Sequence, residues 1–411
     1  MQQGRVQLDA DWNEQVDISG HLLQALARDI VGPHGGPGSS FKIEGKLRRK
    51  NLRYNFAIRE GHYYVDGLLC ENDEACTYKT QLDYPVTDSQ LPKKEGEFLV
   101  YLDVWERMIT SLDDPEIREV ALGGPDTATR TKLVWQAKLA PVGRTSTSGM
   151  KDLAAIMLSR LGRARLPTLQ PRMSAQPGVI PPQSGYTGLE NHLYRVEVHD
   201  PCSGSHDATF KWSRDNGSVL AEILKVRGRV FTVAPQPGHA SIPLTPGDWV
   251  EVSDDAYELQ AQANPLRRIE LVELDKMSVT LDLPPPADVG TAIEKHPKMR
   301  RWDQKENGSI AWESRSGTMK VVPDKWIPLE SGIQVRFSGG EFRTGDYWQI
   351  SARVGPRSMI WPQWRGRPVA MPPEEIHHHY CPLAVLSVEA NGKIAEIKDL
   401  RRLVRPTARS P

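Results

Sequence analysis

The chain of 411 residues is long enough for two or three domains, and 39% of its residues are hydrophobic. Its 52 basic and 52 acidic side chains give a formal net charge of zero, so no charge excess favours nucleic acid or an anionic membrane as a partner. The sequence has no run of 18 apolar residues and no apolar stretch typical of a signal peptide near its start. We therefore expect no nucleic-acid partner, no membrane span and synthesis in the cytoplasm.

Residues 1–31 predict a short strand followed by an amphipathic helix that ends before Gly32-Pro33. From Asp11 onward, apolar residues recur mostly at three- and four-residue steps, which is typical of a helix with one apolar face. This face, called the apolar stripe below, consists of Trp12, Val16, Leu22, Leu23, Leu26 and Ile30. A single helix cannot bury such a stripe alone, so we expect residues 1–31 to dock on the rest of the chain or on another subunit. The expected assembly interface is Trp12, Val16, Leu22, Leu23 and Leu26.

Residues 32–145 predict a first β-rich domain. Its strongest strand is "EFLVYLDVWERMI", in which Phe98, Val100, Leu102 and Val104 alternate with more polar residues. The stretch "DDPEIREVALGGPDTATRTKLVWQAKLAPVG" predicts a helical turn that starts at a proline, a break at "GGPD" and another apolar strand at its end.

The composition changes between residues 146 and 190, where Gly, Pro, Ser and Arg are frequent, so we expect a linker or a long surface excursion there. Residues 191–411 contain short alternating segments at intervals of about 8–12 residues, separated by turn sequences such as "DNG" and "PGD", which is typical of a sandwich or barrel. The expected fold class is mainly β, with an N-terminal strand and amphipathic helix followed by β-sandwich or barrel-like domains.

Three consecutive histidines in "EEIHHHYC" form the one candidate metal site in the sequence. Alternate residues of a strand share a face, so His377 and His379 could bind one metal ion while His378 points away. Three chains meeting at an axis would complete such a site with six nitrogens, which suits an octahedral structural metal. The alternative is that these histidines pack and form hydrogen bonds at the start of a strand. We expect no other cofactor.

No stretch of the sequence supplies a nucleophile, a base and an oxyanion stabiliser at a known motif spacing, so we expect no catalytic residues and no enzyme activity. "FKWSRDNGSV" places Lys211, Arg214 and Asp215 near a tight turn. Because no histidine or second carboxylate stands at the spacing of a catalytic dyad, we interpret these charges as ion pairs.

Several motifs together resemble an uncharacterised bacterial and archaeal family associated with phage-tail-like contractile injection systems. They are "MQQGRVQLDADWNEQ", "GHYYVDGLLCEN", "FLVYLDVWER", "IREVALGGPDTATR", "FKWSRDNGSV", "FRTGDYWQISAR" and "HHHYCPLAVL". The resemblance implies a structural subunit of a baseplate or tail fibre, which binds copies of itself and other tail or baseplate proteins in an assembled particle. Two alternatives remain open at this point, namely a protein that binds or cleaves a cell-surface carbohydrate, and a self-assembling filament or appendage subunit.

Overall fold

Two strands from distant parts of the sequence pair in a long antiparallel ladder. In the computed structural model, β9 (Gly96–Ile109) pairs with β28 (His379–Val388), from Val104 opposite His379 to Gly96 opposite Val388. The structure describes residues 4, 6–7, 9–47, 50–51, 55–84, 86, 91, 94–122, 124, 127–142, 163, 165–174, 185–201, 207–235, 243–286, 289–306, 311–314, 316–374 and 376–404. They form two compact units.

Unit 1 comprises Met1–Met108, Thr131–Gly162 and His377–Pro411, and unit 2 comprises Ile109–Arg130 and Arg163–Ile376. These units differ from the predicted ranges 32–145 and 191–411. The reason is the β9–β28 ladder, which brings the end of the chain into the same sheet as its first third. Unit 2 therefore interrupts unit 1 in the sequence.

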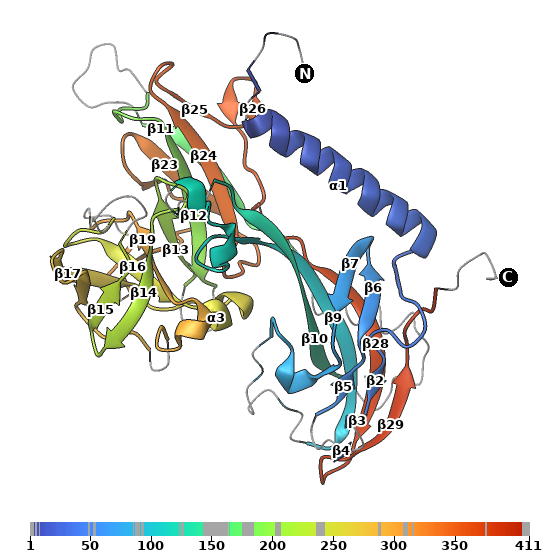
Figure 1. Ribbon diagram of the computed structural model, residues 1–411. Coiled ribbons are helices and arrows are strands. Elements are labelled where there is room, and N and C mark those ends of the chain that lie inside the picture. Colours follow the sequence, from blue (N-terminus) through green and yellow to red (C-terminus); the bar gives the residue numbers. More distant parts are fainter. Residues whose placement is uncertain are drawn as a thin grey trace. The chain divides into compact units, whose positions relative to one another are not determined.

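Unit 1 contains the long helix α1 (Asp9–Val31) and small antiparallel sheets (Figure 1). Its largest sheet has the order β10 (Arg130–Val142), β9, β28, β29 (Ile394–Asp399). A second sheet has the order β1 (His34–Gly35), β6 (Gly61–Val65), β7 (Leu68–Asn72), and a third has β2 (Ile43–Glu44), β5 (Ala57–Ile58), β8 (Cys76–Thr77). The remaining elements are the hairpin β3 (Lys46–Leu47) and β4 (Lys50–Asn51) and the 3₁₀ turn η1 (Tyr78–Thr80).

The alternation along β9 decides which side of the strand enters the core. Val100, Leu102 and Val104 are fully buried and belong to the main core of unit 1, whereas Leu99 and Tyr101 belong to a smaller cluster on the opposite face. Both faces of β9 are therefore covered, which explains why this stretch gives the strongest strand signal in the first half of the sequence.

Unit 2 combines a two-sheet sandwich with a closed barrel. One sheet has the order β20 (Trp312–Glu313), β21 (Thr318–Lys320), β13 (Thr209–Ser213), β12 (His192–Asp200), β24 (Tyr347–Arg353), β25 (Ser358–Ile360). The other sheet has the order β11 (Thr168–Met173), β23 (Ile333–Ser338), β22 (Ile327–Pro328). Side chains of both sheets share one core, in which the Phe337 ring lies 4.9 Å from Phe210 and 5.7 Å from Trp348.

The barrel of unit 2 closes in the strand order β14 (Leu220–Arg227), β15 (Val230–Val233), β18 (Ser278–Leu281), β17 (Arg267–Glu273), β16 (Trp249–Ser253), β19 (Lys298–Trp302). Its interior is a compact apolar cluster that includes Ile223, Phe231 and Val250. The hairpin β26 (Gln363–Trp364) and β27 (Arg367–Pro368) completes the strands of this unit. Its short helices are η3 (Pro115–Ile117), η4 (Val120–Leu122), α3 (Asp255–Leu259) and η5 (Ile293–Lys295).

The mainly β fold class and the helix after the N-terminus are confirmed, with both a sandwich and a barrel present. The predicted N-terminal strand falls largely on residues outside the described ones. Within the predicted linker 146–190, Thr168–Met173 is instead strand β11, which pairs with β23 because Leu169 is fully buried in the sandwich core. Residues 146–162, 164 and 175–184 of that range lie outside the described residues.

Candidate interaction surface and buried charged sites

Helix α1 is attached to its own unit through polar side chains near its C-terminal end. Gln24 Nε2 donates a hydrogen bond to the Asp66 carbonyl oxygen at 3.1 Å, and Arg28 Nε lies 2.8 Å from Asp66 Oδ1. Asp66 and Gly67 form the turn between β6 and β7, both with positive φ. A Cβ atom on Gly67 would lie 2.2 Å from the Gln24 carbonyl oxygen, so glycine at this position permits the close approach of the helix.

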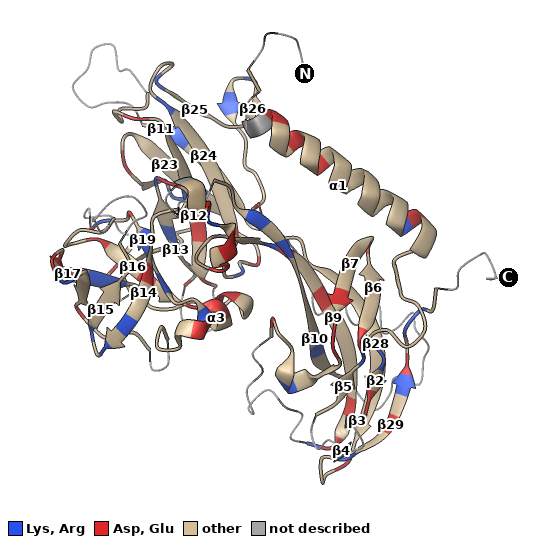
Figure 2. Ribbon diagram, in the orientation of Figure 1, with Lys and Arg blue, Asp and Glu red and all other residues tan. Residues whose placement is uncertain are grey.

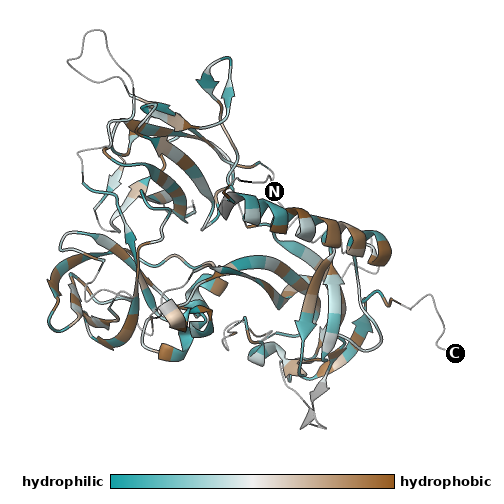
Figure 3. Ribbon diagram, turned by 45° about the horizontal axis from the view of Figure 1, so that its top comes forward, coloured by the Kyte–Doolittle hydropathy of each residue, from teal (hydrophilic) through white to brown (hydrophobic). Residues whose placement is uncertain are grey.

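The apolar stripe of α1 is exposed. The exposed fractions of Trp12, Val16, Leu22, Leu23, Leu26 and Ile30 range from 54% to 70%. At 100° per residue, the stripe is centred well over 90° away from Gln24 and Arg28, so the attachment to unit 1 leaves the apolar side uncovered. All five residues predicted as an assembly interface therefore lie on one exposed face, and Figure 3 shows apolar residues recurring along the helix.

The charged residues of α1 lie toward its two ends, and its central part has none. No charged residue occurs between Asp17 and Arg28. Figure 2 shows this central part without charge, with acidic residues before it and both signs of charge after it. The middle of the helix thus presents an apolar surface without the charges that usually keep an exposed helix soluble.

Unit 2 contains a buried lysine, Lys211, in the motif whose charges were predicted to form ion pairs. Lys211 on β13 is 3% exposed, and its Nζ lies 2.5 Å from Glu251 Oε2 and 3.3 Å from Glu197 Oε1. The same ammonium lies 4.4 Å from the centre of the Trp302 ring, whose Nε1 donates a hydrogen bond to Glu251 Oε2 at 3.0 Å. One cation is therefore shared by the buried Glu251 and the partly buried Glu197. The other charges of this motif also form ion pairs, Arg214 with Glu330 and Asp215 with Arg301.

The electrostatics of this cluster favour the ionised carboxylates. Burial raises the pKa of Glu197, but the charges of Arg195 and Lys211 outweigh that effect and lower the pKa to about 2. His199 lies beside the cluster, with Nδ1 3.9 Å from Glu251 Oε1 and without a hydrogen-bond partner in the described part of the chain. Burial and the nearby Lys211 charge lower the pKa of His199 to about 4, so this imidazole is neutral at pH 7. The sequence signal for this buried cluster was a charged residue inside an apolar strand, as in "RVEV" and "WVEV".

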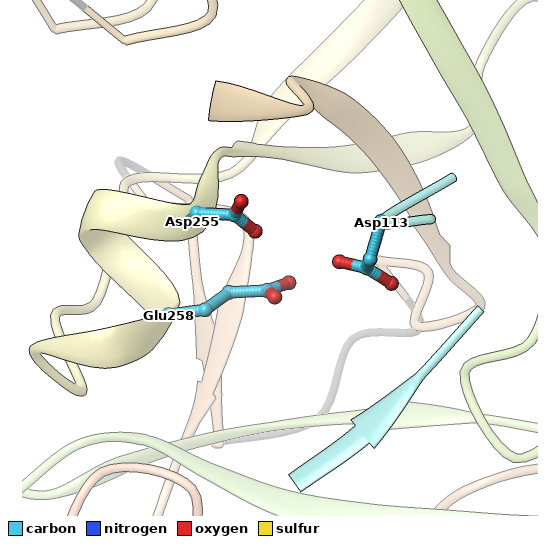
Figure 4. A group of neighbouring side chains, drawn as sticks. All are labelled: Asp113, Asp255 and Glu258. Carbon is cyan, nitrogen blue, oxygen red and sulfur yellow. The ribbon is translucent and has the colours of Figure 1, made fainter. Parts of the chain in front are cut away.

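Three carboxylates of unit 2 point toward one another in Figure 4: Asp113, and Asp255 and Glu258 of α3. Their oxygens lie within 4.8 Å of one another, close enough to resemble a metal site. Lys298 Nζ, however, lies 3.1 Å from Asp113 Oδ1 and 2.8 Å from Glu258 Oε2, and His296 Nδ1 lies 2.6 Å from Asp255 Oδ2. The Lys298 ammonium thus lies between two of the three carboxylates, and the third contacts the His296 ring, so side chains of the protein itself already contact all three.

The histidine stretch divides among different partners. His379 begins β28, and its Nδ1 lies 2.8 Å from Asp66 Oδ2, at the turn that holds α1. His378 Nδ1 lies 2.6 Å from Asp103 Oδ1, and the His378 ring packs 4.7 Å from Trp105. His377 precedes the strand and is exposed. In the part of the chain that the structure describes, the group of three possible metal ligands is the one in Figure 4, and it does not include His377 or His379.

Asp103 shows how these histidines contribute to the fold of unit 1. Its carboxyl is buried, which alone would raise its pKa, but the hydrogen bond with His378 and the charge of Lys138 hold the pKa below its ordinary value. Lys138 Nζ lies 2.6 Å from Asp103 Oδ2. This arrangement matches the packing and hydrogen-bonding alternative for His378, and the metal hypothesis for His377 and His379 stays a prediction.

Fold and surface together define a class: a mainly β protein of two units, with a long helix whose apolar side is uncovered. The model of the family of unknown function DUF6519 matches residues 1–165 and 144–397, so the chain belongs to that family. No helix among the described residues has the length and apolar character needed to cross a membrane.

Other comparisons add little about activity. The chain is 28% identical over 111 residues to the alanine–tRNA ligase of Cutibacterium acnes, a match that covers 27% of this chain and 11% of that enzyme. The match thus spans about a tenth of the length of that relative. No solved structure matches the chain.

Proposed function

We propose that the chain is a structural subunit of a larger particle and works by protein–protein assembly rather than catalysis. The single observation that supports this proposal is the exposed apolar stripe of α1. Burying a side chain such as Leu23 contributes about 1.5–3 kcal/mol relative to leaving it in water. A partner that covers the stripe therefore gains several such contributions from a helix that is already folded and attached to its unit.

The proposed particle is a phage-tail-like contractile injection system or a related assembly, with this chain near the baseplate or tail fibre. This narrower placement is supported by the resemblance of the motifs that run from "MQQGRVQLDADWNEQ" to "HHHYCPLAVL". The helix supports assembly in general. Copies of the chain and other tail or baseplate proteins are the proposed partners.

A carbohydrate-binding role has weaker support. Such a surface would present several exposed tryptophans along a groove. Among the described residues, the exposed tryptophans are Trp12 and Trp364, one in each unit. The groove between β2 and β29 is lined by Ile43, Ile394 and Ile397 together with charged residues, and none of its lining residues is aromatic.

The test is to produce the chain in its native particle with and without residues 1–31, and to measure by electron microscopy and mass spectrometry whether the chain is incorporated. We expect the shortened chain to keep its β-sheet circular dichroism and to be absent from the particle. A full-length His21→Glu variant is the matched control, because His21 is exposed on α1 outside the apolar stripe. Normal incorporation of the shortened chain would contradict the proposal.

A further inference from the structure

We propose that the apolar stripe of α1 is covered by α1 of a second copy, so that two chains pair through a two-stranded coiled coil. The inference rests on the proposed function in one respect, namely that α1 is the assembly surface. It adds the identity of the partner. The spacing of the exposed residues, the charges beside them and the attachment of the helix support it.

The first support is a heptad repeat within the exposed side of the helix. Successive steps of four, three, four, three and four residues connect Trp12, Val16, Ser19, Leu23, Leu26 and Ile30, called the heptad seam below. This alternation is the 3.5-residue period by which two helices keep one seam in contact along their length. Val16, Leu23 and Ile30 share one seam position, and Trp12, Ser19 and Leu26 share the other. β-Branched residues at two of the three places of the first position, with Leu26 at the second, favour two strands over three or four.

Ser19 is the polar member of the heptad seam, and it does not require a partner from outside. Its hydroxyl donates a hydrogen bond to the Gln15 carbonyl oxygen of the same helix at 2.9 Å. A serine in this state is compatible with an apolar seam because its donor is already satisfied.

The second support is the distribution of charge around the heptad seam. Two copies of the same helix repel each other when like charges flank their seam. The flanking positions are uncharged from residue 13 to residue 27, where they are occupied by Asn13, Gln15, Gly20, Leu22 and Ala27. Asp11, Glu14 and Asp17 lie outside the seam and its flanks, and Asp29 is a charged flanking residue at the C-terminal end of the seam. The helix is therefore electrostatically suited to its own copy.

The third support is the way α1 is held. Gln24 and Arg28, which attach the helix to the β6–β7 turn, lie on the side away from the heptad seam. The helix has 23 residues and is about 34 Å long, so the heptad seam spans most of it. Two chains can consequently pair through α1 without disturbing the contacts that hold each helix to its own unit.

The experiment measures the mass of the purified full-length chain by analytical ultracentrifugation over a range of concentrations. We expect a dimer of the 46.1 kDa chain, and an increase of at least about tenfold in its dissociation constant in Leu23→Glu and in Leu26→Glu. The matched control is His21→Glu, which places the same charge on the same helix outside the seam and should leave the dissociation constant unchanged. Near-ultraviolet circular dichroism of each variant shows whether the β units remain folded.

Three outcomes would overturn the inference: a wild-type chain that stays monomeric at the highest concentration reached, a dimer that persists in both glutamate variants, and a trimer that depends on the seam. A monomer with α1 amides protected from hydrogen exchange would show that the stripe docks on its own chain instead.

Incorporation into the particle separates this inference from the proposed function. If the purified chain is monomeric but Leu23→Glu prevents incorporation, the assembly role stands and a different protein covers the stripe. If the purified chain pairs through α1 while particles form normally with Leu23→Glu, the pairing stands and the proposed assembly role is wrong.

Discussion

Leu23 of α1 and Lys211 of β13 both depart from the usual distribution of side chains. The first is an apolar residue in solvent, and the second is a charged residue in the interior. Leu23 is 67% exposed, whereas Lys211 is 3% exposed. The buried lysine has every partner it needs within its unit, because Glu197, Glu251 and Trp302 surround its ammonium. The leucine remains in solvent. A buried charge therefore marks a part of this protein that is complete by itself, and an exposed apolar helix marks a part that another molecule must complete.

The largest expected effect in this comparison comes from removing the buried cation. In Lys211→Met, the buried Glu251 and the partly buried Glu197 would lose the ammonium they share, and we expect the free energy of unfolding to fall by about 3–5 kcal/mol. Chemical denaturation followed by tryptophan fluorescence measures it. Lys276→Met is the control, since Lys276 pairs with Glu273 at the surface, and its denaturation midpoint should not move. A stable Lys211→Met protein would show that the two carboxylates take up protons or water at little cost.

A second effect is a dependence of stability on pH that His199 causes. The unfolded imidazole takes up a proton as pH falls through about 6.5, whereas burial and the Lys211 charge delay protonation of the folded one to about pH 4. The unfolded state therefore binds more protons in this window, and stability falls as pH is lowered from 6.5 to 4, by up to about 3 kcal/mol. Neighbouring Glu197 and Glu251 raise the pKa of His199 by a smaller amount.

His199→Gln should show a correspondingly flatter dependence of its unfolding free energy on pH between 6.5 and 4. Urea denaturation at several pH values compares the two proteins. Equal slopes for wild type and His199→Gln would mean that the imidazole is accessible to protons in the folded state.

A smaller effect of opposite sign is expected in α1. Gly20 lies within the helix, and no atom lies within 4 Å of the position of a Cβ there. Gly20→Ala should stabilise the helix by about 0.5–1 kcal/mol, because alanine loses less backbone entropy than glycine. Hydrogen exchange of the α1 amides should become slower. Faster exchange would indicate that a neighbour approaches Gly20 more closely than the structure shows.

The smallest expected effect concerns the stability of the single chain in Leu23→Glu. An exposed side chain that supports no internal packing should change the free energy of unfolding by less than about 0.5 kcal/mol when measured on monomer. Thermal unfolding at a dilution where the chain is monomeric provides the measurement. A loss above about 2 kcal/mol would place Leu23 in the core of its own chain and remove the contrast with Lys211.

Local sequence patterns predicted the local elements. The spacing of Trp12, Val16 and Leu23 predicted α1, and the alternation around Val100 and Leu102 predicted β9, because each pattern lies within one element. The exposure of the stripe was predicted only as a requirement for some partner. The sequence of α1 does not indicate which side of the helix contacts unit 1. In the structure that side carries Gln24 and Arg28.

Contacts between distant parts of the sequence could not be predicted in the same way. Nothing near Val104 identifies His379 as its partner in the β9–β28 ladder, so the C-terminal strands were predicted to belong to the domain 191–411, whereas β28 and β29 lie in unit 1. Likewise, Lys211 was interpreted as part of ion pairs near a tight turn, while its burial depends on Glu251 and Trp302 of the barrel. Pairing register and burial of polar faces are decided by tertiary structure.

The β9–β28 ladder has a consequence for how the protein is made. About 270 residues separate the end of β9 from the start of β28, and at about 5–20 residues per second the ribosome needs some tens of seconds to synthesise them. During that time most of unit 2 is synthesised, while β9 has an open hydrogen-bonding edge on the side that β28 will occupy. Before the last strands emerge, the open edge of β9 can therefore pair with a strand of another nascent chain on the same messenger RNA.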